Sequence, residues 1–211
     1  MRVVLLKGRD MTIDLNTEPI RERRRRVPKA EASARLIEAT IKLLRERPFD
    51  QVMNQAICAE ADLNPSTILQ HFGTLDQLLA AAAKELVRRY VDVFLAGNDG
   101  PETFNDPDVD LRNRLVAWML LKGSNPAEYN SHVLERPDVI EHQEQQLKVN
   151  RRTAAAWTTA TTMMVEAHSI FRGSHDLDEQ EVRDILELFS AMRDQLPQIE
   201  STLGWDTRSH A

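Results

Sequence analysis

Residues 64–72 read NPSTILQHF, a stretch with the composition of a short helix that has two different faces. Asn64 and Pro65 favour a helix start, because an asparagine side chain can bond to free backbone N–H groups and proline has no N–H to leave unpaired. Ile68 and Phe72 form an apolar pair on one side, and most of the other side chains are polar. A helix this short is unstable alone in water. We therefore expect other helices to support it from behind while its polar face points outwards.

Two helices are predicted before this stretch and one directly after it. The first covers residues 30–47, where apolar residues recur at helical spacing, and the second covers 54–61. Thr74 and Gln77 form a capping-box pattern that opens a long helix ending near residue 96. Its apolar inner face is expected to carry Leu79, Ala82, Leu86, Tyr90 and Val93. The N-terminal helices are expected to share one small core, made of Ile37, Ile41, Leu44, Phe49, Val52, Ile57, Leu63, Ile68 and Phe72. Cys58 is small, so the second and third helices can cross closely beside it.

The rest of the chain also shows helical periodicity and lacks the alternation of apolar and polar residues that is typical of strands. Further helices are predicted at residues 108–122, between 126 and 136, at 138–172 with a break near residue 150, and at 178–195, with a turn at 173–177. The predicted fold class is therefore all-α.

The composition indicates a folded protein of a reducing compartment. The 211 residues are 42% hydrophobic, include a single cysteine and carry a net charge of −6. One cysteine cannot form an internal disulfide, and no segment approaches the ~20 apolar residues of a transmembrane helix, so we expect a cytoplasmic protein with no membrane partner. A second methionine, Met11, leaves residues 1–10 open to two interpretations, an upstream extension or a tail.

The charge is unevenly distributed. Residues 1–75 carry a net charge of +3 and residues 76–211 a net charge of −9. Five arginines lie within residues 21–26. Such a cluster is either a solvated tail or a contact for a polyanion, and the second interpretation gains weight only if a binding element follows.

The segment around residues 64–72 is such an element. Three close helices around one core, the third with polar side chains on its free face, are the arrangement of a helix-turn-helix that reads DNA in the major groove. Gln70 can pair with adenine, and Ser66 and Thr67 can contact bases or phosphates.

The stretch ARLIEATIKLLRERPFDQVMNQAICAEADLNPSTILQHFGTLDQLL, residues 34–79, resembles the N-terminal domain of the TetR family of bacterial transcriptional regulators. The most specific part of the resemblance is the run TILQHF at residues 67–72, followed by Asp76 and Leu78. Beyond residue 79 only the order of the helices agrees.

The sequence departs from the family at positions that contact DNA or shape the turn. The family usually has threonine at the position of Met53, often tyrosine at Leu69 and frequently lysine at Leu75, so two phosphate contacts are expected to be lost. Asp62 replaces a turn glycine, and aspartate tolerates a left-handed backbone. We expect Asn54 to cap the second helix, and the arginine cluster to compensate as an arm along the backbone or in the minor groove.

The resemblance implies that Thr67 and His71 contact phosphates and that Ser66 and Gln70 read base edges. The start of the second helix is also implied to lie near the DNA. Without the motif, Gln70 would be interpreted as a solvated residue. The candidate DNA-binding residues are Arg23, Arg24, Arg25, Arg26, Asn54, Gln55, Ser66, Thr67, Gln70 and His71.

Two apolar seams near the C-terminus have the spacing of near-parallel packed helices. Both seams could be buried within one chain, but the resemblance implies a homodimer formed by the last two large helices. The candidate interface residues are Trp157, Ala160, Met164, Ala167, Phe171, Val182, Ile185, Phe189 and Met192.

The resemblance also implies a small-molecule site in the middle helices, although methionines and aromatic residues at helical spacing are most often plain core. The candidate ligand-binding residues are Phe94, Trp118, Met119, Tyr129, Met163 and His168. The sequence does not identify the effector.

The expected organisation is a flexible basic arm at residues 1–28, a helix-turn-helix domain at 29–73, and a helical ligand-binding and dimerisation domain at 74–211. The expected function is a regulator, in particular a repressor that a small molecule releases from double-stranded operator DNA. The alternative is a dimeric small-molecule-binding protein whose degenerate helix-turn-helix does not bind DNA.

Enzyme chemistry, a cofactor and a metal site are not expected. The sequence has no glycine-rich phosphate loop and no His-Glu-x-x-His pattern, and its histidines at positions 132, 142, 168 and 175 lack the spacing of a helical metal pair.

Overall fold

A computed structural model describes residues 27–97, 106–125, 136–175 and 177–206. All regular elements within these ranges are helices, which confirms the predicted all-α class. The elements are, in chain order, α1 (Lys29–Glu46), the single 3-10 turn η1 (Phe49–Gln51), α2 (Asn54–Glu60), α3 (Ser66–His71), α4 (Leu75–Leu95), α5 (Pro107–Leu121), α6 (Pro137–Leu147), α7 (Arg151–His175), α8 (Glu179–Asp194) and α9 (Leu196–Thr202).

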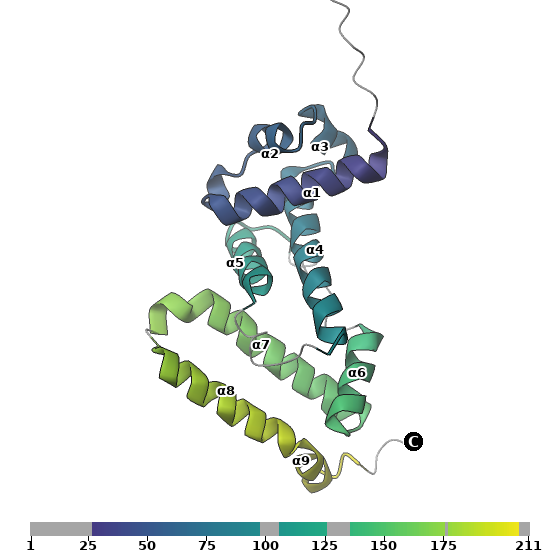
Figure 1. Cartoon of the computed structure of the whole chain (residues 1–211), viewed down its shortest axis with the longest axis vertical. Coiled ribbons are helices and arrows are strands. Elements are labelled where there is room, and N and C mark those ends of the chain that lie inside the picture. Colours follow the sequence, from purple (N-terminus) through teal and green to yellow (C-terminus); the bar gives the residue numbers. More distant parts are fainter. Residues whose placement is uncertain (1–26, 98–105, 126–135, 176, 207–211) are drawn as a thin grey trace, which may run out of the picture.

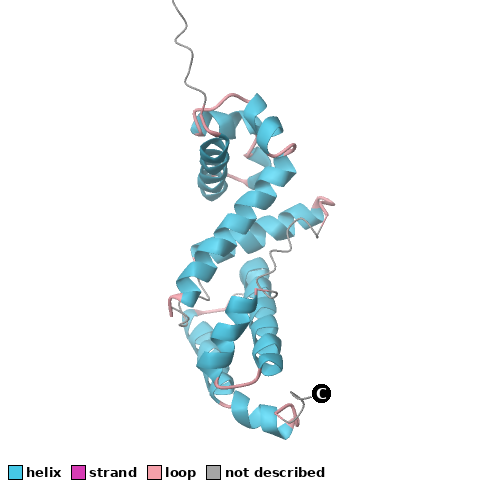
Figure 2. Cartoon of the chain, turned by 90° about the vertical axis from the view of Figure 1, so that its right-hand side faces the viewer, coloured by secondary structure: helices cyan, strands magenta, loops and turns pink. Residues whose placement is uncertain are grey.

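The helices form an elongated molecule with α1, α2 and α3 at one end (Figure 1). Helix α4 leads from this end to α6, and α5 lies beside the upper part of α4. Helices α7 and α8 run alongside each other at the opposite end, as the view turned by 90° also shows (Figure 2).

The main hydrophobic core lies between α1, α2, α3, α4 and α5. Its most deeply buried members include Leu36 from α1, Ile57 from α2 and Leu78 from α4. Leu115 from α5 belongs to the same cluster, so the packing continues from the three N-terminal helices into the long helix and its neighbour. The expected core residues of the first three helices all lie in this cluster or pack against it.

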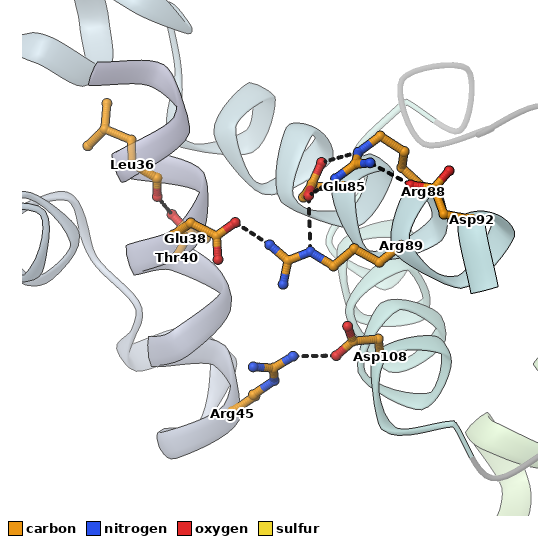
Figure 3. A network of polar contacts seen from close by, with 9 residues as sticks. All are labelled: Leu36, Glu38, Thr40, Arg45, Glu85, Arg88, Arg89, Asp92 and Asp108. Carbon is orange, nitrogen blue, oxygen red and sulfur yellow. Dashed lines mark hydrogen bonds and ion pairs between the residues drawn. The ribbon is translucent and has the colours of Figure 1, made fainter. Parts of the chain in front are cut away.

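Two ion pairs join α1 to the helices below it (Figure 3). Arg89 on α4 pairs with Glu38, and Arg45 pairs with Asp108 on α5. Because each pair connects α1 to a different helix, together with the core they oppose rotation of α1 on the body. Each partly exposed pair is expected to stabilise this contact by no more than about 1 kcal/mol.

Glu85 holds the arginines of α4 in place (Figure 3). It accepts two hydrogen bonds from Arg88, at 2.7 and 2.8 Å, and one from Arg89 Nε at 3.0 Å. The hydrogen bonding from Arg88 is the main reason that the pKa of Glu85 falls to about 2, and Arg89 adds to the effect. Glu85 therefore remains ionised at neutral pH and helps to aim the Arg89 guanidinium at α1.

The break predicted near residue 150 is confirmed. Helix α6 ends at a left-handed residue, Lys148, with φ of 54°. Asn150 then starts α7, because its side-chain oxygen accepts a hydrogen bond from the Thr153 N–H at 3.0 Å. Glu200, on α9, accepts a hydrogen bond from the Asn150 N–H at 2.9 Å and so ties the C-terminal segment to this junction.

Three local predictions were wrong. The turn expected at residues 173–177 begins later, since α7 continues through Gly173 to His175. Helix α9 was not predicted, because Pro197 suggests a helix end although it is equally suited to the first turn of a new helix. Val93, expected on the inner face of α4, is exposed, and Val91 is buried instead. The helix expected between residues 126 and 136 lies outside the described ranges except for its last position.

Candidate DNA-binding surface

The start of α3 is fixed by Asn64 and Pro65. The Asn64 side-chain oxygen accepts hydrogen bonds from the Ser66 N–H at 3.0 Å and from the Ser66 hydroxyl at 2.9 Å. Pro65 already has helical backbone angles, with φ of −53° and ψ of −30°. Asn64 therefore acts as the cap, as the sequence predicted, and Pro65 is the first residue in helical conformation.

The turn between α2 and α3 depends on a left-handed residue. Asp62 has φ of 51°, which confirms that it adopts the conformation for which the family uses glycine. The following residue, Leu63, returns its N–H to the Cys58 carbonyl oxygen at 2.9 Å and closes α2. Burial of Cys58 raises the pKa of its thiol, so this side chain acts as a small apolar residue between the helices.

Gly73 ends α3 and separates it from α4. Its φ is +81°, and a Cβ atom there would lie 2.5 Å from Gln77 Oε1, so both the backbone and the space favour glycine. The predicted capping box then opens α4: the Gln77 N–H donates to Thr74 Oγ1 at 3.1 Å and the Thr74 N–H donates to Gln77 Oε1 at 3.2 Å. The short helix is thus bounded on both sides by specific turn chemistry.

Helix α3 is supported from behind by the core and by α1. Ile68 is buried, and Phe72 packs against the same core. His71 is half-buried, and its Nδ1 lies 2.9 Å from the Ser33 hydroxyl of α1 in a hydrogen bond. The implied phosphate contact of His71 must therefore be made by its other ring nitrogen or after this bond changes.

The outward face of α3 carries Ser66, Leu69 and Gln70, all of which are exposed. These positions are three and four residues apart and share one side of the helix. Thr67 is half-buried at the edge of this face. The structure thus brings the two predicted base-reading residues together and adds a leucine that was not among the candidates.

Asn54 and Gln55 open α2 and are exposed. The prediction that Asn54 caps this helix was wrong, because the cap position is Met53 and its side chain makes no capping hydrogen bond.

An ion pair joins the end of α2 to α1. Lys42 on α1 donates to Glu60 on α2 at 2.6 Å, and this hydrogen bond raises the pKa of Lys42. The four candidate arginines at positions 23–26 lie outside the described residues.

The ligand-binding candidates occupy separate places. Trp118 packs edge-to-face on Phe49, with ring centroids 5.8 Å apart, and Lys122 lies over its ring at 4.0 Å. Met119 is buried in the main core. Both residues therefore lie beside the helix-turn-helix.

A second group of aromatic rings lies farther along α4. Phe94 has its ring centroid 6.2 Å from that of Tyr90 and 5.2 Å from that of His142 on α6. On α7, Met163 is exposed and His168 is half-buried. Tyr129 lies outside the described residues.

Helix α7 presents an exposed apolar face. Ala160, Ala167 and Phe171 of the predicted interface are exposed on it, and Met163 and Ile170 extend the same face. Trp157 and Met164 are half-buried, and the Trp157 ring centroid lies 6.2 Å from that of Phe189 on α8 of the same chain. Some predicted interface residues thus pack within the protomer, while others remain uncovered.

Helix α8 has no fully buried side chain, although every one of its residues is described. Val182, Ile185 and Phe189 are half-buried, and Met192 is exposed. Leu188, which the sequence analysis missed, is 60% exposed. It falls between the two predicted seam positions 185 and 189, and only coordinates show that it remains uncovered.

Sequence reasoning also missed a polar contact between α5 and α7. Arg112 donates to Asn113 Oδ1 at 2.8 Å and to Glu166 at 2.5 Å. Asn113 is buried and donates to the Ser169 hydroxyl at 3.1 Å. These contacts connect the helix behind the DNA-binding end to the helix with the apolar face. The available signal was the run of three polar residues at positions 112–114, directly before the apolar half of α5.

Within the described ranges, no group of three or more potential metal-ligating side chains comes together. Helices long and apolar enough to cross a membrane are likewise missing from the part of the chain that the structure describes.

The arrangement of α2, the tight turn and α3, with a supported second helix and an outward polar face, defines a helix-turn-helix DNA-binding unit. Residues 36–82, which run from α1 into α4, match the family described as bacterial regulatory proteins, tetR family. This match supports the resemblance to TetR-family transcriptional regulators that the motif at residues 67–72 indicated.

A solved structure of a TetR-like transcriptional regulator from Rhodococcus sp. RHA1 is similar at 18% sequence identity. The alignment covers 85% of this chain and 100% of that chain, with a TM-score of 0.41. No match was found among curated proteins.

Proposed function

We propose that this protein is a cytoplasmic, homodimeric repressor that binds operator DNA through α3 and is released by a small molecule bound in its helical body. The observation that carries this proposal is the outward face of α3, where Ser66 and Gln70 stand exposed on a helix fixed at both ends. Because the helix that carries these side chains is already fixed, they can enter the major groove at a small cost in conformational entropy.

In this proposal Gln70 makes the main base contact. Its amide can bond to the N6 and N7 edge of adenine, and Ser66 contacts a base or a phosphate nearby. Thr67 and His71, at the sides of the helix, contact phosphates and set its orientation. Asn54 and Gln55 approach the DNA from α2, and the arginines at positions 23–26 follow the backbone or enter the minor groove.

The dimer is proposed to form between the exposed faces of α7 and α8. An exposed apolar surface of this kind is unfavourable in water and marks an interaction site. A second copy would cover it with the same residues, since a two-fold interface places one patch against itself. The dimer would also present a second copy of α3 to the adjacent turn of the major groove.

Release by a ligand is proposed to act through the contacts of α1 with α4 and α5. A ligand among α4, α6 and α7, near Phe94, shifts the population towards a form in which the two reading helices are spaced wrongly for the operator. The ion pair of Arg89 with Glu38 and the packing of Trp118 on Phe49 support this route, because they connect the body directly to the helix-turn-helix.

The test is binding to DNA selected by the full-length protein from a random library, measured by fluorescence anisotropy. Gln70→Ala should weaken binding by about 1–3 kcal/mol, roughly 5- to 150-fold, because one bidentate base contact is lost. Gln146→Ala, which changes an exposed glutamine on α6, should bind like the unmodified protein. Equal affinities for all three proteins would contradict the assignment of Gln70.

A further inference from the structure

Leu69 is an unusual side chain for the outward face of a short DNA-binding helix. It is 70% exposed, whereas Ile68 beside it is buried. The capping contacts at Asn64 and Gly73 fix where α3 begins and ends, and Ile68 is anchored in the core. Leu69 is therefore held towards solvent, and the folded protomer gains little from it because so much of its apolar surface remains in water.

The neighbours of Leu69 show which molecule can cover it. It lies between Ser66 and Gln70, three residues after one and directly before the other, on the exposed face through which α3 is proposed to bind DNA. Any partner that contacts Gln70 in the major groove also comes close to Leu69. The edge of DNA in this groove is polar except for one group, the C5-methyl of thymine.

We propose that Leu69 reads a thymine by packing on its C5-methyl group, beside the base pair that Gln70 contacts. This inference rests on the proposed DNA binding through α3 and adds a specificity-determining residue to it. If Gln70 bonds to adenine, a thymine in the adjacent base pair presents its methyl group in the same groove. Each half-site therefore contains two neighbouring A·T pairs, one contacted by Gln70 and the other by Leu69.

The contact is apolar, so it can be removed from the DNA without disturbing hydrogen bonds. Deoxyuridine differs from thymidine only by the missing C5-methyl group. The experiment replaces the thymines of the selected DNA by deoxyuridine one at a time and measures the dissociation constant of the full-length protein. At one thymine in each half-site, the loss should be about fourfold, the value of one methyl group withdrawn from water.

Leu69→Ala supplies the second half of the test. Because the Leu69 side chain is exposed, its removal should leave the fold intact, and circular dichroism with thermal unfolding checks this directly. The variant should bind the thymine-containing DNA about fourfold more weakly or worse, and deoxyuridine at the sensitive position should then cause no further loss. Leu121→Ala, which changes an 89% exposed leucine at the end of α5, should keep the full sensitivity to deoxyuridine.

Three results would overturn the inference in different ways. If no single deoxyuridine substitution affects binding, Leu69 does not read a methyl group although the protein still recognises DNA. If Leu69→Ala remains as sensitive as the unmodified protein, another side chain contacts that methyl group. If the protein selects no sequence from the library, the proposed DNA binding itself fails, and the inference fails with it.

Discussion

The two ends of the molecule differ in how completely one chain buries its apolar side chains. Around α1 to α5, leucine and isoleucine side chains such as Leu36, Ile57 and Leu78 are removed from water. On α7 and α8, Phe171 is 53% exposed and Leu188 is 60% exposed. The first region is a closed core, and the second leaves apolar side chains in water, as the proposed dimer interface requires.

This difference assigns separate tasks to the two ends. Helix α3 is only six residues long and depends for its conformation on the closed hydrophobic core behind it. In the proposed dimer, a second chain covers the exposed apolar face of α7 and α8 and also supplies a second copy of α3. The fold of one chain thus fixes the shape of α3, and the proposed dimer would set the distance between two copies of it.

The largest effect is expected at the exposed apolar face of α7 and α8, the proposed dimer interface. Leu188→Glu combined with Met192→Glu places four new charges in the dimer and removes four apolar side chains from it, at a cost of about 6 kcal/mol or more. Sedimentation velocity at micromolar concentration should then detect monomers. Ser190→Glu is the matched control, because it adds a charge at another side of α8 and should leave the dimer intact. A dimer that persists in the double variant would show that this face is not the interface.

A smaller effect is expected in the closed core. Leu78 is fully buried where α4 meets the N-terminal helices, so Leu78→Ala should lower the free energy of unfolding by about 2–5 kcal/mol. The exposed Leu121 on α5 provides the comparison, since Leu121→Ala should cost less than about 0.5 kcal/mol. Urea denaturation followed by circular dichroism measures both. Similar losses for the two variants would contradict the contrast between buried and exposed leucines.

The smallest effect is expected from Glu85 and depends on pH. The pKa of Glu85 is lowered from 4.5 to about 2 in the folded chain, chiefly by hydrogen bonding from Arg88. Because this pKa is lowered, the ion pair of Glu85 with Arg88 stabilises the fold above about pH 4.5, and its contribution is lost as the pH falls towards 2. Glu85→Gln should therefore reduce stability at neutral pH, by no more than about 1 kcal/mol for a partly exposed group, and flatten the decline between pH 4.5 and 2.

Thermal unfolding of the two proteins across this pH range measures the difference. Glu141→Gln, which changes an exposed glutamate on α6, controls for the loss of a charge. If Glu85→Gln and the unmodified protein decline in parallel, hydrogen bonding from Arg88 does not contribute to stability.

The DNA-binding end could be predicted from the sequence because its signals are local. Thr74 and Gln77 bond to each other across three residues, and Asn64 caps a helix that begins at the next residue. Asp62 stands where the resembling family has a turn glycine, and its backbone is left-handed. Each of these features depends on neighbours within a few positions.

Features that depend on distant parts of the chain could not be predicted in the same way. Trp118 was a ligand candidate by residue type, but its ring packs on Phe49, a contact that only the arrangement of η1 and α5 creates. Gly173 suggested a turn, whereas α7 continues through it, since one glycine costs a helix only about 1 kcal/mol. The exposure of Leu69 and Leu188 likewise depends on what packs around them.

The most direct test of the account is a hydroxyl-radical footprint of the full-length protein on DNA selected from a random library. Two copies of α3 held by one dimer should protect two segments whose centres lie about one helical turn, roughly 34 Å, apart. Both segments should lose protection together in the Leu188→Glu, Met192→Glu variant. A single protected segment, or a footprint unchanged in that variant, would contradict the claim that a dimer sets the spacing of the reading helices.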